Sequence, residues 1–352
     1  MTNQFFKFLL SIFVIVPIFL TAQSAQNDGE NSPQLFADND FLPIKFRYSK
    51  KQLKKETNDS TYMNSVISYE SNEGTWDTLD VEIRARGNFR RKTCFFTPIK
   101  LKVKKSSAKG TIFQKNRKLK VVFPCLNEYT KDDNVLKEYL IYKMYEIATP
   151  YHFKTRLIDV EFDDVKNKKS KSYQLKGFLI EDYDKVAKRL NGKTVKRAFY
   201  PQGYDDLFAV RNAMFQFMVG NTDFSPTYSH NSKVVFVDKK FVPISYDFDM
   251  SGFVNTSYTL VSQSRRTELP IEEVTERYYM GYRRDMQLFE KVRLEFLNNK
   301  KEYLAVVDKH KSYFDSQKSY ETARSYLMGF FEILADKSKF KKRTYDIATK
   351  MN

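Results

Sequence analysis

The stretch VGNTDFSPTYSHNSKVVFVDKKFVPISYDFDMSGFVN, residues Val219–Asn255, contains the clearest structural signal in this chain of 352 residues. An apolar run is followed, after the turn residues Asp238–Lys240, by apolar residues at alternate positions. This pattern predicts two short strands, Lys233–Val237 and Phe241–Tyr246, joined as a β-hairpin.

A polar loop precedes the predicted hairpin, and an acidic corner follows it. The loop carries Asp223 and Asn231, and the corner carries Asp247 and Asp249. Because a hairpin returns the chain on itself, we expect Asp247 to lie close to Asn231. Carboxylate and amide oxygens gathered in this way suit Mg²⁺, which prefers oxygen ligands and usually also holds a substrate phosphate. Asp223 would be free to orient an attacking hydroxyl, so the stretch predicts a phosphoryl-transfer site.

These residues also resemble a known family. GNTD…HN, followed by a hairpin and PISYDFD, resembles the catalytic segment of the CotH (spore coat protein H) kinase family of atypical protein kinases, and is similar to that of HipA-like kinases. The resemblance implies that Asp223 is the catalytic aspartate. It also implies that Asn231 and Asp247 bind the metal. Asp249, in the same acidic corner, is a further candidate metal ligand.

The spacing departs from that of ordinary protein kinases, which place the asparagine about five residues after the aspartate. Here Asn231 follows Asp223 at a longer distance, with Pro226 between them. The ligand role is therefore open between His230 and Asn231, and Asn221 is a further polar candidate without an assigned role. The alternative interpretation is a hairpin whose acidic corner caps a helix or pairs with a basic neighbour.

A second segment, RGNFRRKTCFFTPIKLKVKK, resembles the N-terminal part of the CotH family, which carries an RGN turn followed by a K-x-K strand. The family shows Ser or Thr after RGN, whereas Phe89 stands here. A glycine turn with basic flanks is able to lie over phosphates, so Arg86 is a candidate for nucleotide binding. Lys100 and Lys102 share one face of the following strand, and the sequence does not decide which would pair with the phosphates of ATP. The alternative is an exposed turn and a solvated strand edge.

A helix is predicted from Asp132 or Asp133 to just before Pro150, with apolar residues along one side. Glu138 lies on its polar side. In a kinase-like protein, a helix glutamate orients the phosphate-binding lysine, so Glu138 is the candidate for this role. The alternative is a glutamate that faces solvent.

The order of the predicted elements suggests two parts. Residues 41–183 are β-rich, with strands expected at Leu42–Tyr48, Tyr62–Tyr69, Leu79–Arg86, Ile99–Lys104, Lys118–Phe123, Arg156–Phe162 and Ser172–Ile180. Residues 184–352 are mainly helical and contain the predicted catalytic loop and acidic corner. With the resemblance, we expect an α+β fold of the two-lobed, atypical-kinase-like kind, with a β-rich N-lobe and a helix-rich C-lobe.

The N-terminus predicts export. Residues 1–25 have the basic start, apolar run and small residues of a signal peptide, and residues 26–40 form a polar, flexible lead-in. We expect a periplasmic, outer-surface or secreted protein that is not an integral membrane protein after cleavage, with an uncleaved anchor as the alternative. Cys94 and Cys125 either pair in an oxidising compartment or remain two separate buried thiols.

The charge balance favours anionic partners. Sixty Lys and Arg against 43 Asp and Glu give a formal net charge of +17. Such a surplus concentrates anions near the protein. Because export argues against nucleic acid, nucleotides, phosphates or anionic envelope polymers are the expected partners.

The functional expectation is transfer of the γ-phosphoryl group of ATP, with Mg²⁺, to a hydroxyl of an unidentified protein or glycan acceptor. The alternative is a non-catalytic envelope protein, on a kinase-like scaffold, that binds an anionic glycan or protein partner. A metal-dependent hydrolase at the acidic corner is a third class, which no His pair or nucleophilic serine motif supports.

Overall fold

The computed structural model describes residues 34–127, 132–166, 169–197, 199–225, 228, 230–259, 261 and 269–351. The predicted signal peptide, residues 1–25, lies outside the described residues, as does the lead-in up to residue 33. The segment Pro33–Asn352 forms one compact unit.

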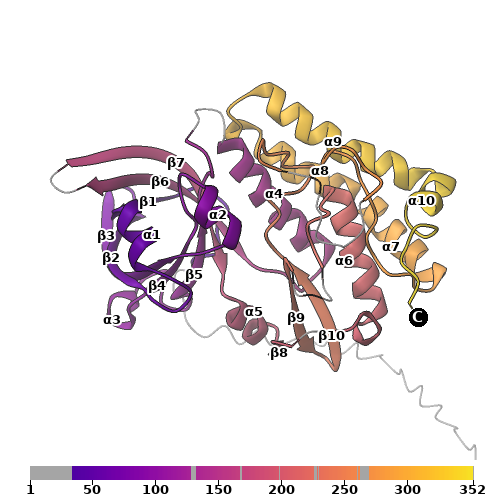
Figure 1. Cartoon of the computed structure of the whole chain (residues 1–352), viewed down its shortest axis with the longest axis horizontal. Helices are drawn as coiled ribbons and strands as arrows, with labels where there is room; N and C mark the ends of the chain where they lie inside the picture. The colour runs from indigo at the N-terminus through magenta and orange to yellow at the C-terminus, as the bar shows by residue number, and fades with distance from the viewer. Residues whose placement is uncertain are drawn as a thin grey trace, which may run out of the picture. The chain divides into compact units, whose positions relative to one another are not determined.

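Seven strands form a closed barrel, in the order β1-β2-β3-β4-β5-β7-β6 (Figure 1). They are β1 (Leu42–Tyr48), β2 (Met63–Asn72), β3 (Thr75–Ala85), β4 (Ile99–Val103), β5 (Lys118–Val122), β6 (Thr155–Lys166) and β7 (Lys169–Glu181). The sheet closes because β1 pairs with β2 in the antiparallel sense and with β6 in the parallel sense. Along β4, Ile99, Leu101 and Val103 are buried in the barrel core. Lys100 and Lys102 therefore point outward.

The prediction of a two-lobed, atypical-kinase-like fold is wrong. The strands lie close to where the alternating pattern predicted them, but they close into a barrel rather than forming the sheet of a kinase lobe. The barrel closes where β1 pairs with β6. Ile44, for example, pairs with Val160, which is far away in the sequence. Periodicity within a strand shows which face is buried, but it does not show which distant strand is the neighbour.

A second, three-stranded antiparallel sheet has the order β10-β9-β8. Its strands are β8 (Lys193–Val195), β9 (Ser232–Val237) and β10 (Lys240–Ser245). Helix α6 (Asp206–Val219) packs on β10, and α4 (Asp132–Ala148) packs on both α6 and β7 of the barrel. Helix α4 thus links the barrel to the sheet that carries the predicted hairpin.

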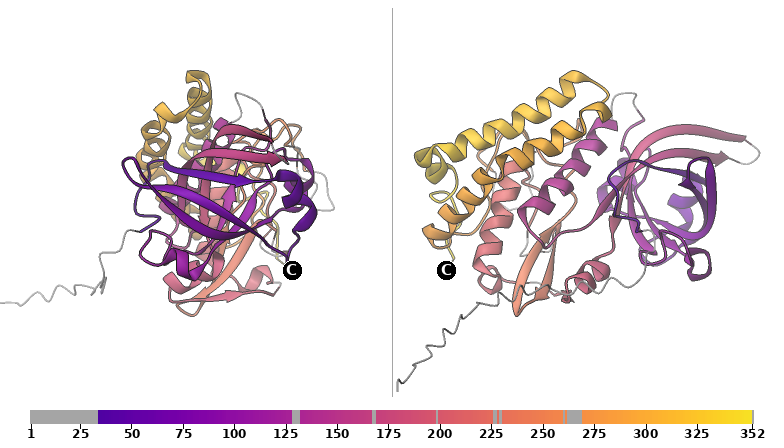
Figure 2. Two further views of the ribbon diagram at one scale, coloured as in Figure 1. Left: turned by 90° about the vertical axis from the view of Figure 1, so that its left-hand side faces the viewer. Right: turned by 180° about the vertical axis from the view of Figure 1, so that it is seen from behind.

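The remaining helices are short, apart from those near the C-terminus. Near the barrel and the second sheet lie α1 (Lys50–Glu56), α2 (Asn88–Thr93), α3 (Lys105–Ala108), α5 (Tyr183–Arg189) and the 3₁₀ helix η1 (Pro201–Gly203). The C-terminal part contains α7 (Met286–Asn298), α8 (Lys300–Lys309), η2 (Lys311–Tyr313), α9 (Gln317–Ala335) and α10 (Lys337–Arg343). Figure 2 shows α7, α8 and α9 alongside α4 and α6, with which they share one hydrophobic core. Among the described helices, none has the length and apolar character needed to cross a membrane.

Helix α6 ends where the polar loop begins. Asp205 caps its N-terminus by accepting a hydrogen bond from Phe208 N. At the other end, Gly220 adopts a left-handed conformation with φ 63°. Glycine suits this position because a side chain there would be strained. A Cβ on Gly220 would also lie 2.0 Å from the hydroxyl of Tyr326. This stop directs the chain into the Asn221–Asp223 segment.

Candidate functional site

The hairpin predicted from the sequence is present as β9 and β10. Asp238 and Lys239 in the turn both have positive φ, 49° and 60°, as in a two-residue type I′ connection. Ser232 pairs with Ser245 at the open end of the hairpin. The next residues continue the pairing, because Tyr246 N donates a 3.1 Å hydrogen bond to Asn231 O. The expectation that Asp247 returns close to Asn231 is therefore confirmed.

Asn231 and Asp247 share an unusual backbone conformation. Their φ angles are 47° and 65°, in the left-handed region that residues other than glycine rarely adopt. Such strain is often concentrated at functional sites, where the surrounding structure enforces it. Here the backbone of Asp247 is fixed by a 2.9 Å hydrogen bond from its N–H to the hydroxyl of Tyr142 on α4.

Asp223 is hydrogen-bonded to both polar residues at the end of the loop. Asn231 Nδ2 donates to Asp223 O at 2.8 Å and to Asp223 Oδ2 at 3.0 Å. His230 Nε2 lies 2.9 Å from Asp223 Oδ1, and this hydrogen bond raises the pKa of His230 against the opposing effect of burial. Because the amide nitrogen of Asn231 is used in this way, its side-chain oxygen is left for another partner. In the described part of the chain, that oxygen makes no hydrogen bond.

Asn221 holds the polar loop in place through two hydrogen bonds of its side chain. Its side chain is buried, accepts a 3.0 Å hydrogen bond from Asp223 N and donates one of 2.9 Å to Gln216 on α6. Gln216 in turn donates to Ser245 at the end of β10. This chain of contacts holds Asp223 against the hairpin, so the geometry gives Asn221 a positioning role rather than a contact with a ligand.

The polar loop and the acidic corner border a cavity of about 330 Å³. Of the residues predicted from the sequence, the cavity wall includes Arg86, Asp223, His230, Asn231, Asp247 and Asp249. Residues not predicted for the site also line it, namely Gly87, Arg90, Pro98, Tyr246 and Met250. Neither Lys100, Lys102, Glu138 nor Asn221 is part of this wall.

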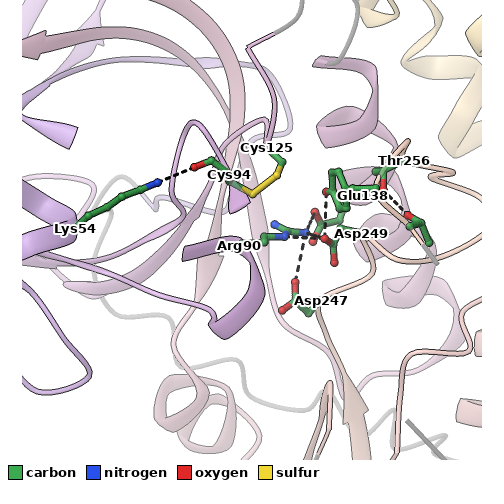
Figure 3. The surroundings of a disulfide bond; sticks show 10 residues. Lys54, Arg90, Cys94, Cys125, Glu138, Asp247, Asp249 and Thr256 are labelled. Atoms are coloured by element: carbon green, nitrogen blue, oxygen red, sulfur yellow. Dashed lines mark hydrogen bonds and ion pairs between the residues drawn. A yellow bond between two sulfur atoms is a disulfide. The ribbon is translucent and has the colours of Figure 1, made fainter. Parts of the chain in front are cut away.

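Arg90 on α2 joins three carboxylates in the interior (Figure 3). Its Nε donates to Asp249 Oδ2 at 2.7 Å, and its Nη2 donates to Glu138 Oε2 at 3.0 Å. Arg90 Nη2 also lies 3.6 Å from Asp247 Oδ1. The predicted glutamate–lysine pair is thus replaced by a pair of Glu138 with an arginine. Arg90 stands in the RGNFRR segment, but the sequence gives no sign that it reaches α4.

Burial and charge act in opposite directions on these carboxylates. Burial raises the pKa of Glu138 to about 7, although Arg90 opposes the shift. Burial also leaves the pKa of Asp249 raised. For Asp247, burial raises the pKa, but the guanidinium groups of Arg90 and Arg86 outweigh it and the net shift is downward. Asp247 is thus the member of the group that is held ionised, and it faces the cavity.

The two candidate phosphate-binding lysines have different surroundings. Lys102 forms a 2.5 Å ion pair with Glu82 on the neighbouring strand β3, and both side chains are partly exposed. Lys100 lies nearer the cavity end of β4, opposite Arg84 and Lys120 in the barrel register. Burial, followed by repulsion from Arg84, lowers the pKa of Lys100. The geometry therefore separates two lysines that the sequence left equivalent.

Cys94 and Cys125 form a disulfide bond. Of the two possibilities that the sequence left open, a disulfide or two separate buried thiols, the structure contains the disulfide. It joins the residue after α2 to the segment after β5, next to Arg90 (Figure 3). Cys94 O also accepts a 3.0 Å hydrogen bond from Lys54 Nζ. The disulfide fixes the helix from which Arg90 reaches the acidic residues.

Compared with known proteins, the chain matches no protein-family model and has no significant similarity to a curated protein. The resemblance to the CotH family therefore rests on the motif residues themselves.

Proposed function

We propose that this protein transfers the γ-phosphoryl group of ATP to a hydroxyl group, with Mg²⁺ as the metal ion. The observation that carries the proposal is the meeting of Asp223, Asn231 and Asp247 at one cavity, beside the basic side chain of Arg86. Phosphoryl transfer needs an acid that places the nucleophile, oxygen ligands for a metal and positive charge for the phosphates. The fold adds no support, because one architecture can host many activities.

The donor atoms fit Mg²⁺. Among the described residues, no cluster of three or more His, Cys, Asp and Glu side chains could hold a metal ion. Mg²⁺ does not require one, since it is usually held by one or two carboxylates together with waters and substrate phosphates. Within the described part of the chain, Asp247 Oδ1 is buried and lacks a hydrogen-bond partner. Asp247 and the side-chain oxygen of Asn231 are thus the ligands, and a bound Mg²⁺ would neutralise charge on the phosphates.

Asp249 is less suited to bind metal in this arrangement. Its Oδ2 accepts hydrogen bonds from Arg90 at 2.7 Å and from the Tyr258 hydroxyl at 3.2 Å. A metal ion would have to compete with Arg90 for this oxygen. We assign Asp249 to holding Arg90 in place.

Asp223 has the position of the residue that orients the acceptor. Its carboxylate is fixed by His230 and Asn231 but remains 22% exposed at the cavity. In the proposed step, the acceptor oxygen forms a bond to the γ-phosphorus while the bond from this phosphorus to the β–γ bridging oxygen breaks. ADP leaves with the electron pair of that bond, and Asp223 accepts the hydroxyl proton.

Export remains part of the proposal. The Cys94–Cys125 disulfide supports it, because disulfides persist mainly in oxidising compartments. A periplasmic, outer-surface or secreted location requires a source of ATP, or of another phosphoryl donor, outside the cytoplasm.

A non-catalytic binding protein is the second candidate. It is favoured by the positions of Arg86 and Arg90, which lie 3.8 and 3.6 Å from the carboxylate of Asp247 and compensate its charge without a metal ion. On this interpretation the cavity and the positive surface bind an anionic glycan or protein partner.

Calorimetry with ATP, in Mg²⁺ or in EDTA, separates the two candidates. We expect binding by the wild type that requires Mg²⁺ and is weakened at least about tenfold by Asp247→Asn. The matched control is Asp184→Asn, which removes an exposed carboxylate from the first turn of α5 and should bind normally. A folded wild type that does not bind ATP would overturn the kinase proposal and leave the binding protein.

Transfer is measured with γ-labelled ATP, as label incorporated into the protein itself or into a mixture of acceptor proteins. Asp223→Asn should keep ATP binding but reduce transfer by about 10²-fold or more. Transfer by Asp223→Asn at the wild-type rate would remove Asp223 from the mechanism.

A further inference from the structure

A group of basic residues surrounds Tyr246, which is next to Asp247 and lines the cavity. Lys120 Nζ on β5 lies 4.2 Å from the centre of the Tyr246 ring, and Lys233 Nζ on β9 lies 5.6 Å from it. Lys100 is paired with Lys120 in the register of β4 and β5. Three separate strands thus contribute lysines to the same region.

Within the part of the chain that the structure describes, these three lysines lack a carboxylate partner for their charge. Among the described residues, none of Lys100, Lys120 and Lys233 has a carboxylate within ion-pair distance. On the same face of β4, Lys102 is paired with Glu82, and on the same face of β5, Lys118 is exposed to solvent. Lysines that are both partly buried and, in the described chain, without an ion-paired carboxylate therefore gather at the end of the strands that is nearest Tyr246, whereas Lys118 is exposed to solvent.

Gathering like charges in this way is unfavourable in the absence of an anion. Burial lowers the pKa of Lys120 to about 7, and repulsion by Arg86, Lys233 and Lys100 adds to the shift, against the attraction of Asp247. The rings of Tyr246 and Phe153 provide cation–π contacts to Lys120, but such contacts do not neutralise its charge.

We propose that Arg86, Lys100, Lys120 and Lys233 together form the binding site for the phosphate chain of the nucleotide, with Lys120 as the central phosphate contact. The inference rests on the proposed function, since the γ-phosphate would lie at Asp247 and the rest of the chain along these lysines. A polyphosphate supplies several adjacent negative charges, which the three lysines lack within ion-pair distance in the described part of the chain. It would restore the favourable charged form of Lys120 and relieve the repulsion among its neighbours.

The test uses inorganic tripolyphosphate in EDTA, so that binding requires neither the metal ion nor phosphoryl transfer. We expect the wild-type protein to bind it in calorimetry and Lys120→Met to weaken binding at least about tenfold. Lys233→Met provides a second variant, with a similar loss, should the Lys120 variant fold poorly. There are two matched controls. Lys118→Met lies two residues before Lys120 on the same face of β5, and Lys102→Met lies two residues after Lys100 on the same face of β4.

The outcomes separate this inference from the proposed function. Normal tripolyphosphate binding by both Lys120→Met and Lys233→Met would overturn the inference even if the wild type transfers phosphate. An equal loss in Lys118→Met would also overturn it, because the binding would then reflect the general positive charge of the surface. Lys120-dependent binding in a protein that transfers no phosphate would keep the anion site and reject the kinase proposal.

Discussion

Arg90 and Asp249 are 159 positions apart in the sequence, yet Arg90 Nε donates a 2.7 Å hydrogen bond to Asp249 Oδ2 in the protein interior. Arg90 is 7% exposed and Asp249 is 6% exposed. The contact joins α2, next to the barrel, to the acidic corner that follows the hairpin. Since Arg90 also binds Glu138, a single guanidinium group connects three segments of the chain.

Replacing Arg90 should strongly destabilise the protein. In Arg90→Met, Glu138 and Asp249 lose their shared partner and are left buried, close to Asp247 and to each other. Breaking a buried ion pair by removing one member typically costs about 3 to 5 kcal/mol. We expect a decrease of this size in the free energy of unfolding, measured by urea denaturation at pH 7.

Lys92→Met is the matched control, because it removes a positive charge from the exposed side of the same short helix. Its free energy of unfolding should stay within about 0.5 kcal/mol of the wild type. Equal effects of the two substitutions would show that the contacts of Arg90 add nothing beyond its charge.

Loss of the disulfide should weaken the same region. Cys94 and Cys125 are 31 residues apart, and closing a loop of this size stabilises a protein by roughly 3 to 4 kcal/mol in the chain-entropy model. Reduction with dithiothreitol should lower the denaturation midpoint of the wild type. It should have no effect on the double variant Cys94→Ala/Cys125→Ala, which serves as the control. A wild type that denatures identically with and without reductant would contradict this prediction.

Local signals in the sequence predict the elements well. The alternation of apolar residues places every barrel strand near its observed position, and the turn at Asp238 and Lys239 defines the hairpin. The approach of Asp247 to Asn231 follows directly from that hairpin. Each of these features depends on residues that are close together in the chain.

The features that the sequence does not reveal depend on distant residues. Closure of the barrel requires β1 to pair with β6, and no pattern within either strand specifies that partner. The pairing of Glu138 with Arg90, rather than with a lysine of β4, depends on how α2 packs beside α4. Nothing in the sequence distinguishes Lys120 from other strand lysines, because its surroundings are set by Tyr246, which follows β10 far along the chain.

Gly220 provides a direct test of how the Asn221–Asp223 segment is positioned. In Gly220→Ala, the residue must keep a φ of 63°, and its Cβ would lie 2.0 Å from the Tyr326 hydroxyl. Left-handed backbone strain costs about 1 kcal/mol, and overpacking typically adds about 1 to 3 kcal/mol. We expect the free energy of unfolding to fall by about 2 to 4 kcal/mol in urea denaturation.

Two variants separate the contributions to this effect. Gly74→Ala has a similar φ of 71°, with no atom within 4 Å of the added Cβ, so it should show the backbone cost alone. Tyr326→Phe removes the clashing oxygen and should recover part of the stability of Gly220→Ala in the double variant. If Gly220→Ala costs no more than Gly74→Ala, the contact with Tyr326 does not constrain this turn.

His152 should contribute to loss of stability in acid. Its Nδ1 lies 2.8 Å from the backbone oxygen of Thr149, which can only accept, so this nitrogen carries the proton in the neutral ring. Burial lowers the pKa of His152 from 6.5 to about 4, and the Thr149 hydrogen bond only partly opposes this. Between these two pH values the unfolded chain binds a proton that the folded protein does not. The stability from this difference is present above pH 6.5 and is lost as the pH falls through the window to about 4.

His152→Gln removes the titration while keeping a side chain that can donate to Thr149 O. The wild type should lose about 1 to 3 kcal/mol more than this variant between pH 7 and pH 4, as measured by urea denaturation across the range. An NMR titration of the imidazole provides the direct control, because the prediction requires His152 to stay neutral at pH 5 in the folded protein. Parallel stability curves for the two proteins, or a native His152 that titrates near its ordinary pKa, would contradict it.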